Sequence, residues 1–196
     1  MPSQVVSATP HDLAGVAGFG LDPTFADQLA TLLMTCRAAG FEFRVSQGLR
    51  TPQKQAAYYC QWVKHPVADV DAAVQKLRDR DAPWLADMLS GFRDITRTNR
   101  WLTNALPGEG WHQWGLAADC YCFENGKMVS SGDAPCYKFY AEQAVKLGLT
   151  AGFNFKQKDA GHVQGPSANG ASNVYAWSHI DGVMKSRFAD KTDVVR

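Results

Sequence analysis

The sequence lacks the features that mark a zinc-finger protein, a disulfide scaffold or a membrane protein. Its five cysteines are an odd number and include no Cys-x-x-Cys pair, so neither zinc-finger spacing nor a disulfide framework fits. No stretch approaches the roughly 18 apolar residues needed to span a bilayer. The formal net charge of +1 supplies no basic field for nucleic acid. We therefore expect reduced, mostly buried thiols, no membrane insertion and no nucleic-acid partner.

A secretory signal is also missing from the beginning of the sequence. The segment MPSQVVSATPHDLAGVAG has neither a basic start nor an unbroken apolar core. We therefore expect synthesis in the cytoplasm without a visible signal peptide.

The residues that are present predict one α+β domain over residues 1–196. A chain of 196 residues with 45% apolar side chains can bury the core of a single domain, and it shows no internal repeat. Apolar periodicity and capping residues predict helices at about 23–39, 52–63, 68–80, 83–97, 135–147 and 174–189. Alternating or apolar runs predict strands in FEFRVSQG, LAADCYCF, KMVS, LTAGF and HVQ. This layout predicts a small, mostly antiparallel sheet that is flanked by helices and carries the functional site.

A first pair of candidate metal ligands lies in GWHQWGLAADCY. His112 and Asp119 are seven residues apart, with Gly115 between them. The glycine allows a sharp turn, so the chain can leave a loop at the histidine and return as a strand at the aspartate. An imidazole nitrogen and a carboxylate oxygen can then converge on one ion. This spacing also occurs by chance, so for the pair alone a structural histidine is the default interpretation.

The segment KDAGHVQG supplies a third candidate ligand, His162, and an acid three residues before it, Asp159. Two histidines and one carboxylate with an open coordination position are typical of catalytic zinc sites. Asp159, near the metal but not bound to it, would take a proton from water and return it to a leaving amine. The alternative is that Asp159 fixes its loop as an Asx-turn residue.

Arg50 is the candidate for binding negative charge. It follows an expected strand and a glycine in RVSQGLRTPQKQ, which places it at a sheet edge. Its guanidinium would stabilise the oxyanion of a tetrahedral intermediate or bind a substrate carboxylate. An arginine at a helix entry is otherwise an ordinary surface residue.

Together these segments resemble the VanY-like zinc peptidases, which include D-alanyl-D-alanine carboxypeptidases and the L-alanyl-D-glutamate endopeptidases of phage lysins. His112, Gly115, Ala117 and Asp119 meet the family motif H-x-x-G-x-A-x-D. DAGHVQ is close to the DGGHVEL form of some phage lysins, and SQGLRT resembles the arginine motif. TNALPGEGW and GLTAGFNF resemble the stretches that precede the two histidine motifs, and the order of the motifs is that of the family.

The resemblance implies Zn²⁺ held by His112, Asp119 and His162, with Asp159 as the catalytic acid and base and Arg50 stabilising the transition state. The implied substrate is the stem peptide of bacterial peptidoglycan. We expect a monomeric, lysin-like L-alanyl-D-glutamate endopeptidase that reaches the wall after release by another protein. A D-alanyl-D-alanine carboxypeptidase and a non-catalytic wall-binding module are the alternatives.

The chain departs from the family pattern in several respects. Residues 61–100 are longer than the family leads us to expect and predict a helical insertion, and residues 165–196 form a C-terminal extension. Many relatives use glutamate as the catalytic acid, whereas Asp159 is one methylene shorter.

Two further residue sets compete with this assignment. His179 in WSHID is another possible third ligand, but Ala176 stands where the acid would be needed. We therefore expect His179 to be a packed residue of the C-terminal helix. A cysteine hydrolase that uses Cys120 or Cys122 with a histidine is the other alternative.

Overall fold

The computed structural model describes residues 14–100, 102–165 and 169–190. The chain divides into two compact units, each made of two segments of sequence. Unit 1 contains Met1–Leu49 and Gly115–Ala168, and unit 2 contains Arg50–Trp114 and Asn169–Arg196. Among the described residues, no helix combines the length and the apolar character that crossing a membrane requires.

Unit 1 is built on a five-stranded antiparallel sheet in which β1, β2, β5 and β4 lie side by side and β3 pairs with β2. The strands are β1 (Glu42–Gln47), β2 (Ala117–Glu124), β3 (Lys127–Met128), β4 (Thr150–Ala151) and β5 (His162–Gln164). Asn125 and Gly126 both have positive φ, 52° and 76°, and join β2 to β3 as the predicted hairpin turn. The α+β fold and the mostly antiparallel sheet predicted from the sequence are confirmed.

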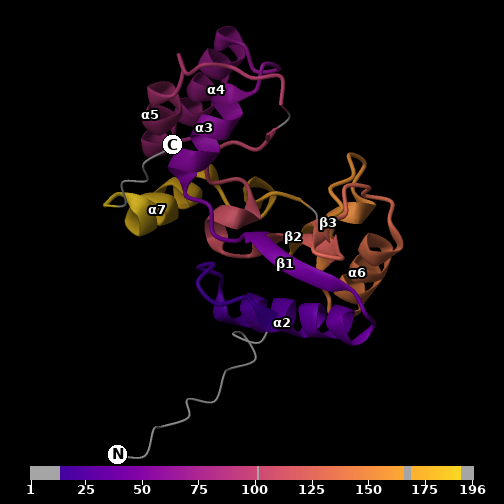
Figure 1. Ribbon diagram of the computed structural model, residues 1–196. Helices are drawn as coiled ribbons and strands as arrows, with labels where there is room; N and C mark the ends of the chain where they lie inside the picture. The colour runs from indigo at the N-terminus through magenta and orange to yellow at the C-terminus, as the bar shows by residue number, and fades with distance from the viewer. Residues whose placement is uncertain (1–13, 101, 166–168, 191–196) are drawn as a thin grey trace, which may run out of the picture. The chain divides into compact units, whose positions relative to one another are not determined.

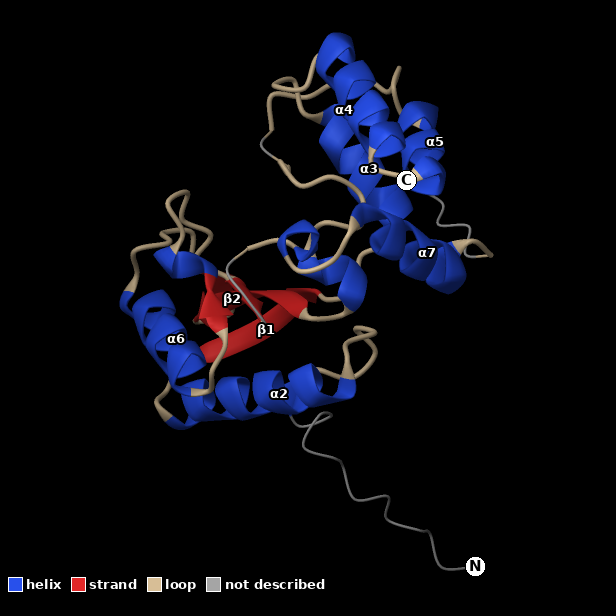
Figure 2. Cartoon of the chain, turned by 180° about the vertical axis from the view of Figure 1, so that it is seen from behind, coloured by secondary structure: helices blue, strands red, loops and turns tan. Residues whose placement is uncertain are grey.

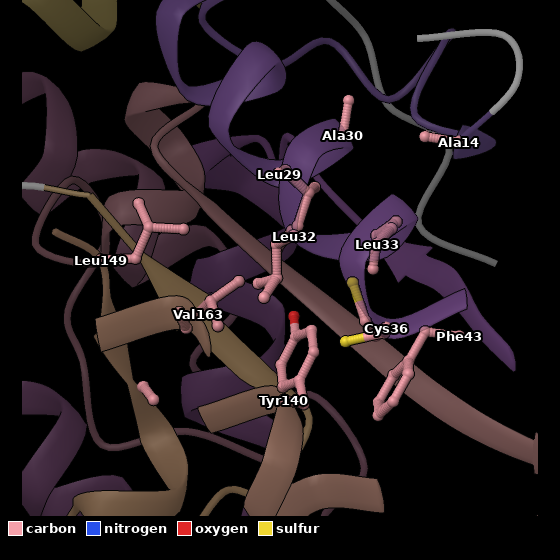
Figure 3. Close-up of a cluster of buried hydrophobic side chains, with 14 of the residues drawn as sticks. Ala14, Leu29, Ala30, Leu32, Leu33, Cys36, Phe43, Tyr140, Leu149 and Val163 are labelled. Atoms are coloured by element: carbon pink, nitrogen blue, oxygen red, sulfur yellow. The ribbon is translucent and has the colours of Figure 1, made fainter. Parts of the chain in front are cut away.

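One face of this sheet forms the core of unit 1. Phe43 lies opposite Cys122 and Val45 opposite Cys120, so the apolar positions of β1 and β2 share a face. Against this face pack the helices α2 (Pro23–Ala38) and α6 (Pro135–Lys146). Figure 3 shows Leu29, Leu32 and Cys36 of α2 near Tyr140 of α6 and Val163 of β5.

Capping explains where the helices of unit 1 begin. The side chain of Asp22 accepts hydrogen bonds from the backbone N–H groups of Thr24 and Phe25, at 3.0 and 3.2 Å, and Pro23 fills the first helical position. Pro135 occupies the same position in α6. Figure 1 shows α2, the indigo helix, running beside β1.

Unit 2 consists mainly of helices, which Figure 2 labels α3, α4, α5 and α7. They are α3 (Pro52–Gln61), α4 (Val67–Asp79), α5 (Pro83–Gly91) and α7 (Trp177–Phe188). The N-cap residue of α5, Ala82, makes no capping hydrogen bond through its side chain. Instead, the carboxylate of Asp181 on α7 accepts a hydrogen bond from Leu85 N at 2.8 Å. The C-terminal extension therefore packs with the predicted helical insertion. Whether residues 1–196 behave as one domain stays a prediction.

Two elements differ from the sequence prediction. The helix predicted for 83–97 ends at Gly91, and Thr98 instead forms backbone hydrogen bonds with Gln61, the last residue of α3, and with Val63. The strand predicted in LTAGF is limited to Thr150–Ala151, since Gly152 begins a short 3₁₀ turn.

Candidate active site

Two predicted ligands meet on the face of the sheet opposite the core. Asp119 of β2 and His162 of β5 are directly opposite each other in the antiparallel register. Such pairs bring side chains on one face into contact. Nδ1 of His162 lies 2.9 Å from Oδ1 of Asp119. The structure thus joins the carboxylate of one sequence motif to the histidine of another.

The second ring nitrogen of His162 also faces an oxygen. Its Nε2 lies 2.9 Å from Oε1 of Gln164, two residues further along β5 and therefore on the same face. His162 is 9% exposed and Gln164 is 6% exposed, so little solvent competes for these contacts. Burial lowers the pKa of His162, but the hydrogen bond and the charge of Asp119, with Gln164 and Asp159, outweigh it and leave that pKa raised.

This arrangement suits a bound cation. A neutral imidazole carries one N–H and therefore satisfies one acceptor, whereas both nitrogens of His162 face oxygens. An imidazolium satisfies both oxygens, because each of its nitrogens carries a proton. A neutral ring satisfies the Gln164 oxygen through Nε2–H, and its Nδ1 can then bind a metal ion together with the Asp119 carboxylate. Nitrogen and carboxylate oxygen are donors that Zn²⁺ accepts. The residues present therefore fit the metal that the sequence resemblance implies.

Asp159 is held close to His162 by a tight turn. Its backbone N–H donates to the carbonyl of Gly152 at 2.9 Å, and its carbonyl accepts from the N–H of His162 at 3.1 Å. A Cβ on Gly152 would lie 2.5 Å from the Asp159 carbonyl oxygen and 2.8 Å from Cβ of His162. Glycine is therefore required for this approach, and the half-buried Asp159 carboxylate is near enough to raise the pKa of His162.

The two predicted site residues of unit 2 are also joined. Arg50 N donates to the carbonyl of His112 at 3.2 Å. His112 is 5% exposed and lies in a 3₁₀ helix, Trp111–Trp114. The guanidinium of Arg50 donates to Oε1 of Gln55 at 2.9 Å and lies over the ring of Tyr58, 5.2 Å from its centroid.

Gln55 organises the surroundings of Arg50. It is 1% exposed, and its amide donates to Oγ1 of Thr103 at 2.9 Å and to the carbonyl of Ala105 at 2.8 Å. Its Oε1 also accepts from Nε2 of the buried Gln113 at 3.2 Å. Buried amides with partners at every position rigidify the groups they contact. Arg50 is thus a positioned side chain rather than an ordinary surface arginine.

His179, the alternative third ligand, is placed by the structure on the helix predicted for it but not in the predicted environment. His179 lies on α7, as predicted, but it is exposed, with its ring 5.1 Å from that of Tyr175. The expectation of a packed histidine is therefore wrong. The helix places its side chain outward because Trp177, Ile180 and Met184 provide the buried face.

The cysteines are unsuited to nucleophilic catalysis. All five are free and buried. Burial raises the pKa of Cys120 to about 12, and burial together with Cys136 raises that of Cys122 still further. A nucleophilic cysteine needs a lowered pKa and access to its substrate. The structure therefore opposes the cysteine-hydrolase alternative.

Two glutamines of the site were missed by the sequence analysis. Gln164 contacts His162, and Gln47 lies directly opposite Asp119 after a register shift between Val45 and Gln47. Strand periodicity from His162 could have identified Gln164. Gln47 depends on the irregular register, for which the sequence carries no signal.

Comparison with known proteins gives one family match. The family model described as VanY, D-alanyl-D-alanine carboxypeptidase, matches residues 19–166. This range includes Arg50, both proposed histidine ligands, Asp119 and Asp159. No curated protein sequence matches the chain.

Several solved structures are similar at low identity. The Serratia marcescens L-Ala D-Glu endopeptidase ChiX is 18% identical, with a TM-score of 0.40 over 75% of this chain and 81% of its own. The LD-carboxypeptidase LdcB is 17% identical, with a TM-score of 0.45 over 85% and 64%. The vancomycin-resistance D,D-pentapeptidase VanY, in complex with Zn(II), is 18% identical, with a TM-score of 0.43 over 82% and 83%.

Proposed function

Since this chain belongs to the VanY family of D-alanyl-D-alanine carboxypeptidases, and is thus a peptidoglycan peptidase, we propose that it hydrolyses its substrate as a zinc enzyme. The proposed ligands are His112, Asp119 and His162. The observation that carries the proposal is the contact between Asp119 and His162, because it joins two separate motifs in one metal-compatible pair. His112 precedes Asp119 by seven residues, in the spacing of the family motif.

Zinc, when bound, supplies Lewis-acid chemistry: it polarises the scissile carbonyl and lowers the pKa of water towards ~7. Asp159 then accepts the proton of the attacking water and returns it to the amine that leaves. The turn that holds Asp159 beside His162 supports this role.

Arg50 is proposed to stabilise the carbonyl oxygen as negative charge develops on it. A guanidinium presents several N–H donors in a fixed plane, and the contacts with Gln55 and Tyr58 hold this one in place. Preorganised donors of this kind act in the transition state without further reorganisation.

We propose that the bond cut is the L-alanyl-D-glutamate bond of the stem peptide. The segment DAGHVQ supports this choice, because it is close to the DGGHVEL form of some phage lysins. A D-alanyl-D-alanine carboxypeptidase is the second candidate, and the description of the matching family favours it.

Mass spectrometry of purified peptidoglycan after incubation with zinc-loaded protein tests the proposal. An endopeptidase releases stem-peptide fragments that begin with D-glutamate, whereas a carboxypeptidase releases only free D-alanine. Either product should vanish when a chelator removes the metal. The His162→Ala variant should lose both zinc binding and product.

Two outcomes of the same assay would contradict the proposal. Products that persist with a chelator would exclude metal-dependent catalysis. Bound but uncut peptidoglycan, measured by co-sedimentation over several wall types, would favour the non-catalytic binding module. The control variant is Lys146→Ala, on the last turn of α6, which should leave product formation unchanged.

A further inference from the structure

We infer that Gln164 is a positioning residue that fixes the ring orientation and the protonated nitrogen of His162, so that Nδ1 is presented to the metal beside Asp119. The inference rests on the proposed zinc site and deepens it. It assigns a task to a buried glutamine that neither the ligand set nor the proposed mechanism uses.

The position of Gln164 is rigid. β5 pairs on both sides, with Ala117 of β2 and Thr150 of β4 opposite Gln164, so its backbone is fixed by two neighbours. Gln164 is 6% exposed, and its side chain shares a face of the sheet with His162. A buried amide oxygen that faces a buried ring nitrogen at 2.9 Å is a strongly determined contact, because leaving either group unpaired is costly.

The chemistry of the amide decides which nitrogen carries the proton. Oε1 of Gln164 accepts hydrogen bonds and donates none, so it pairs with a protonated Nε2. In a neutral ring that protonation leaves the lone pair on Nδ1, the nitrogen 2.9 Å from Asp119. A histidine ligand whose other nitrogen donates to a fixed acceptor is held in the tautomer and orientation that binding requires.

The acceptor that this chain places beside His162 is a neutral amide. The lysin-like form DGGHVEL carries glutamate where this sequence has Gln164. Both side chains offer an oxygen at the same reach, but glutamate adds a negative charge that strengthens the hydrogen bond from Nε2. Gln164→Glu should therefore preserve the contact, whereas Gln164→Met keeps the length of the side chain and removes the acceptor.

Zinc affinity, measured by competition with a fluorescent chelator, is the first readout. Gln164→Met should weaken zinc binding about 10- to 100-fold, which is typical when a partner of a ligand is removed. Gln164→Glu should bind zinc at least as tightly as the parent. The matched control is Gln28→Met, which removes a glutamine hydrogen bond to the Leu147 carbonyl elsewhere in unit 1 and should leave zinc affinity unchanged.

The second readout is the ¹⁵N spectrum of the His162 ring, recorded with and without zinc. The parent and Gln164→Glu should show a protonated Nε2 that exchanges slowly with water, and Gln164→Met should lose that slow exchange. Parent-like zinc affinity and an unchanged ring spectrum in Gln164→Met would overturn the inference. If Gln164→Met does not fold, a tenfold loss of zinc affinity in Gln164→Glu would overturn it instead.

Failure of the proposed function would give a different result from failure of the inference about Gln164. A parent protein that binds no zinc and releases no fragments removes the zinc-peptidase proposal. The metal-free ring spectra then still decide whether Gln164 holds the proton on Nε2.

Discussion

Main-chain hydrogen bonds of Asp159, to Gly152 and from His162, hold the turn that precedes His162. A substitution at this residue can therefore remove the carboxylate while the turn keeps its backbone hydrogen bonds. We expect Asp159→Ala to retain zinc and to lower kcat about 10²- to 10⁴-fold, the usual contribution of a positioned general base. Metal analysis of the purified variant and steady-state kinetics on muropeptides measure both quantities.

Two control variants separate basicity from shape at Asp159. Asp159→Asn keeps the size of the side chain but not its basicity, and should be as impaired as Asp159→Ala. Asp159→Glu restores a carboxylate with one more methylene and should recover part of the turnover. Full activity in Asp159→Asn would remove this residue from proton transfer.

Arg50 presents a second test at the residue scale. Removing a preorganised donor to a developing oxyanion costs about 10²- to 10³-fold in kcat, so Arg50→Ala should lose that much with little change in zinc content. Arg50→Lys keeps the charge but not the planar fork, and should recover only part of the loss. Arg44→Ala, which removes an exposed partner of Glu42, is the matched control and should be neutral. Equal kcat in Arg50→Ala and the parent would contradict the assignment.

Among the elements, α5 depends on a cap supplied by another helix. Asp181 is 7% exposed, and its carboxylate accepts the hydrogen bond of Leu85 N near the start of α5. Asp181→Ala should lower the free energy of unfolding by about 1–3 kcal/mol, because it leaves a buried N–H without an acceptor. Thermal unfolding followed by circular dichroism measures the loss. Asp181→Asn keeps an acceptor and should lose less; an equal loss would argue against the cap.

The beginnings of elements could be predicted from the sequence better than their ends. Asp22, Thr51 and Pro135 are local signals for helix entry, and α2, α3 and α6 begin where these residues predict. The segment after Gly91, predicted to continue the helix, instead includes Thr98, whose backbone hydrogen bonds reach Gln61 and Val63, more than thirty residues earlier in the chain. Local patterns carry no information on such contacts.

The same distinction holds for the site. The motifs predicted Asp119 and His162, because the order of residue types is enough to identify a family motif. The contact of Gln164 with His162 and the place of Gln47 opposite Asp119 are consequences of strand pairing. Glutamine is common on surfaces, so its presence in a sequence does not distinguish a site residue from a solvated one.

At the scale of the whole molecule, the buried thiols predict how stability depends on pH. Burial raises the pKa of Cys36 and of Cys120 to about 12, whereas an unfolded thiol ionises near ~8.5. Between these two pKa values the thiols stay protonated in the folded state, whereas they lose their protons in the unfolded state. Each thiol contributes stability that is complete below pH ~8.5 and is lost as pH rises, by about 1.4 kcal/mol per pH unit.

Urea unfolding between pH 8 and pH 11 measures this dependence. Cys36→Ala should be less stable at neutral pH, because it leaves a cavity, and its stability should fall less steeply with rising pH. Comparing slopes cancels the titration of tyrosines and lysines, which both proteins share. Parallel slopes for the two proteins would show that Cys36 is not protected from ionisation.

The order in which the strands occur along the chain has a consequence for synthesis on the ribosome. β1 emerges first, but its neighbour β2 is translated only after α3, α4 and α5 are complete. Pairing across such a long loop is entropically costly and slow to form. The nascent chain therefore carries a strand with exposed edges while the helices behind it are already made. Because unpaired edges invite association between chains, we expect the yield of soluble protein to rise when chaperones are abundant during synthesis.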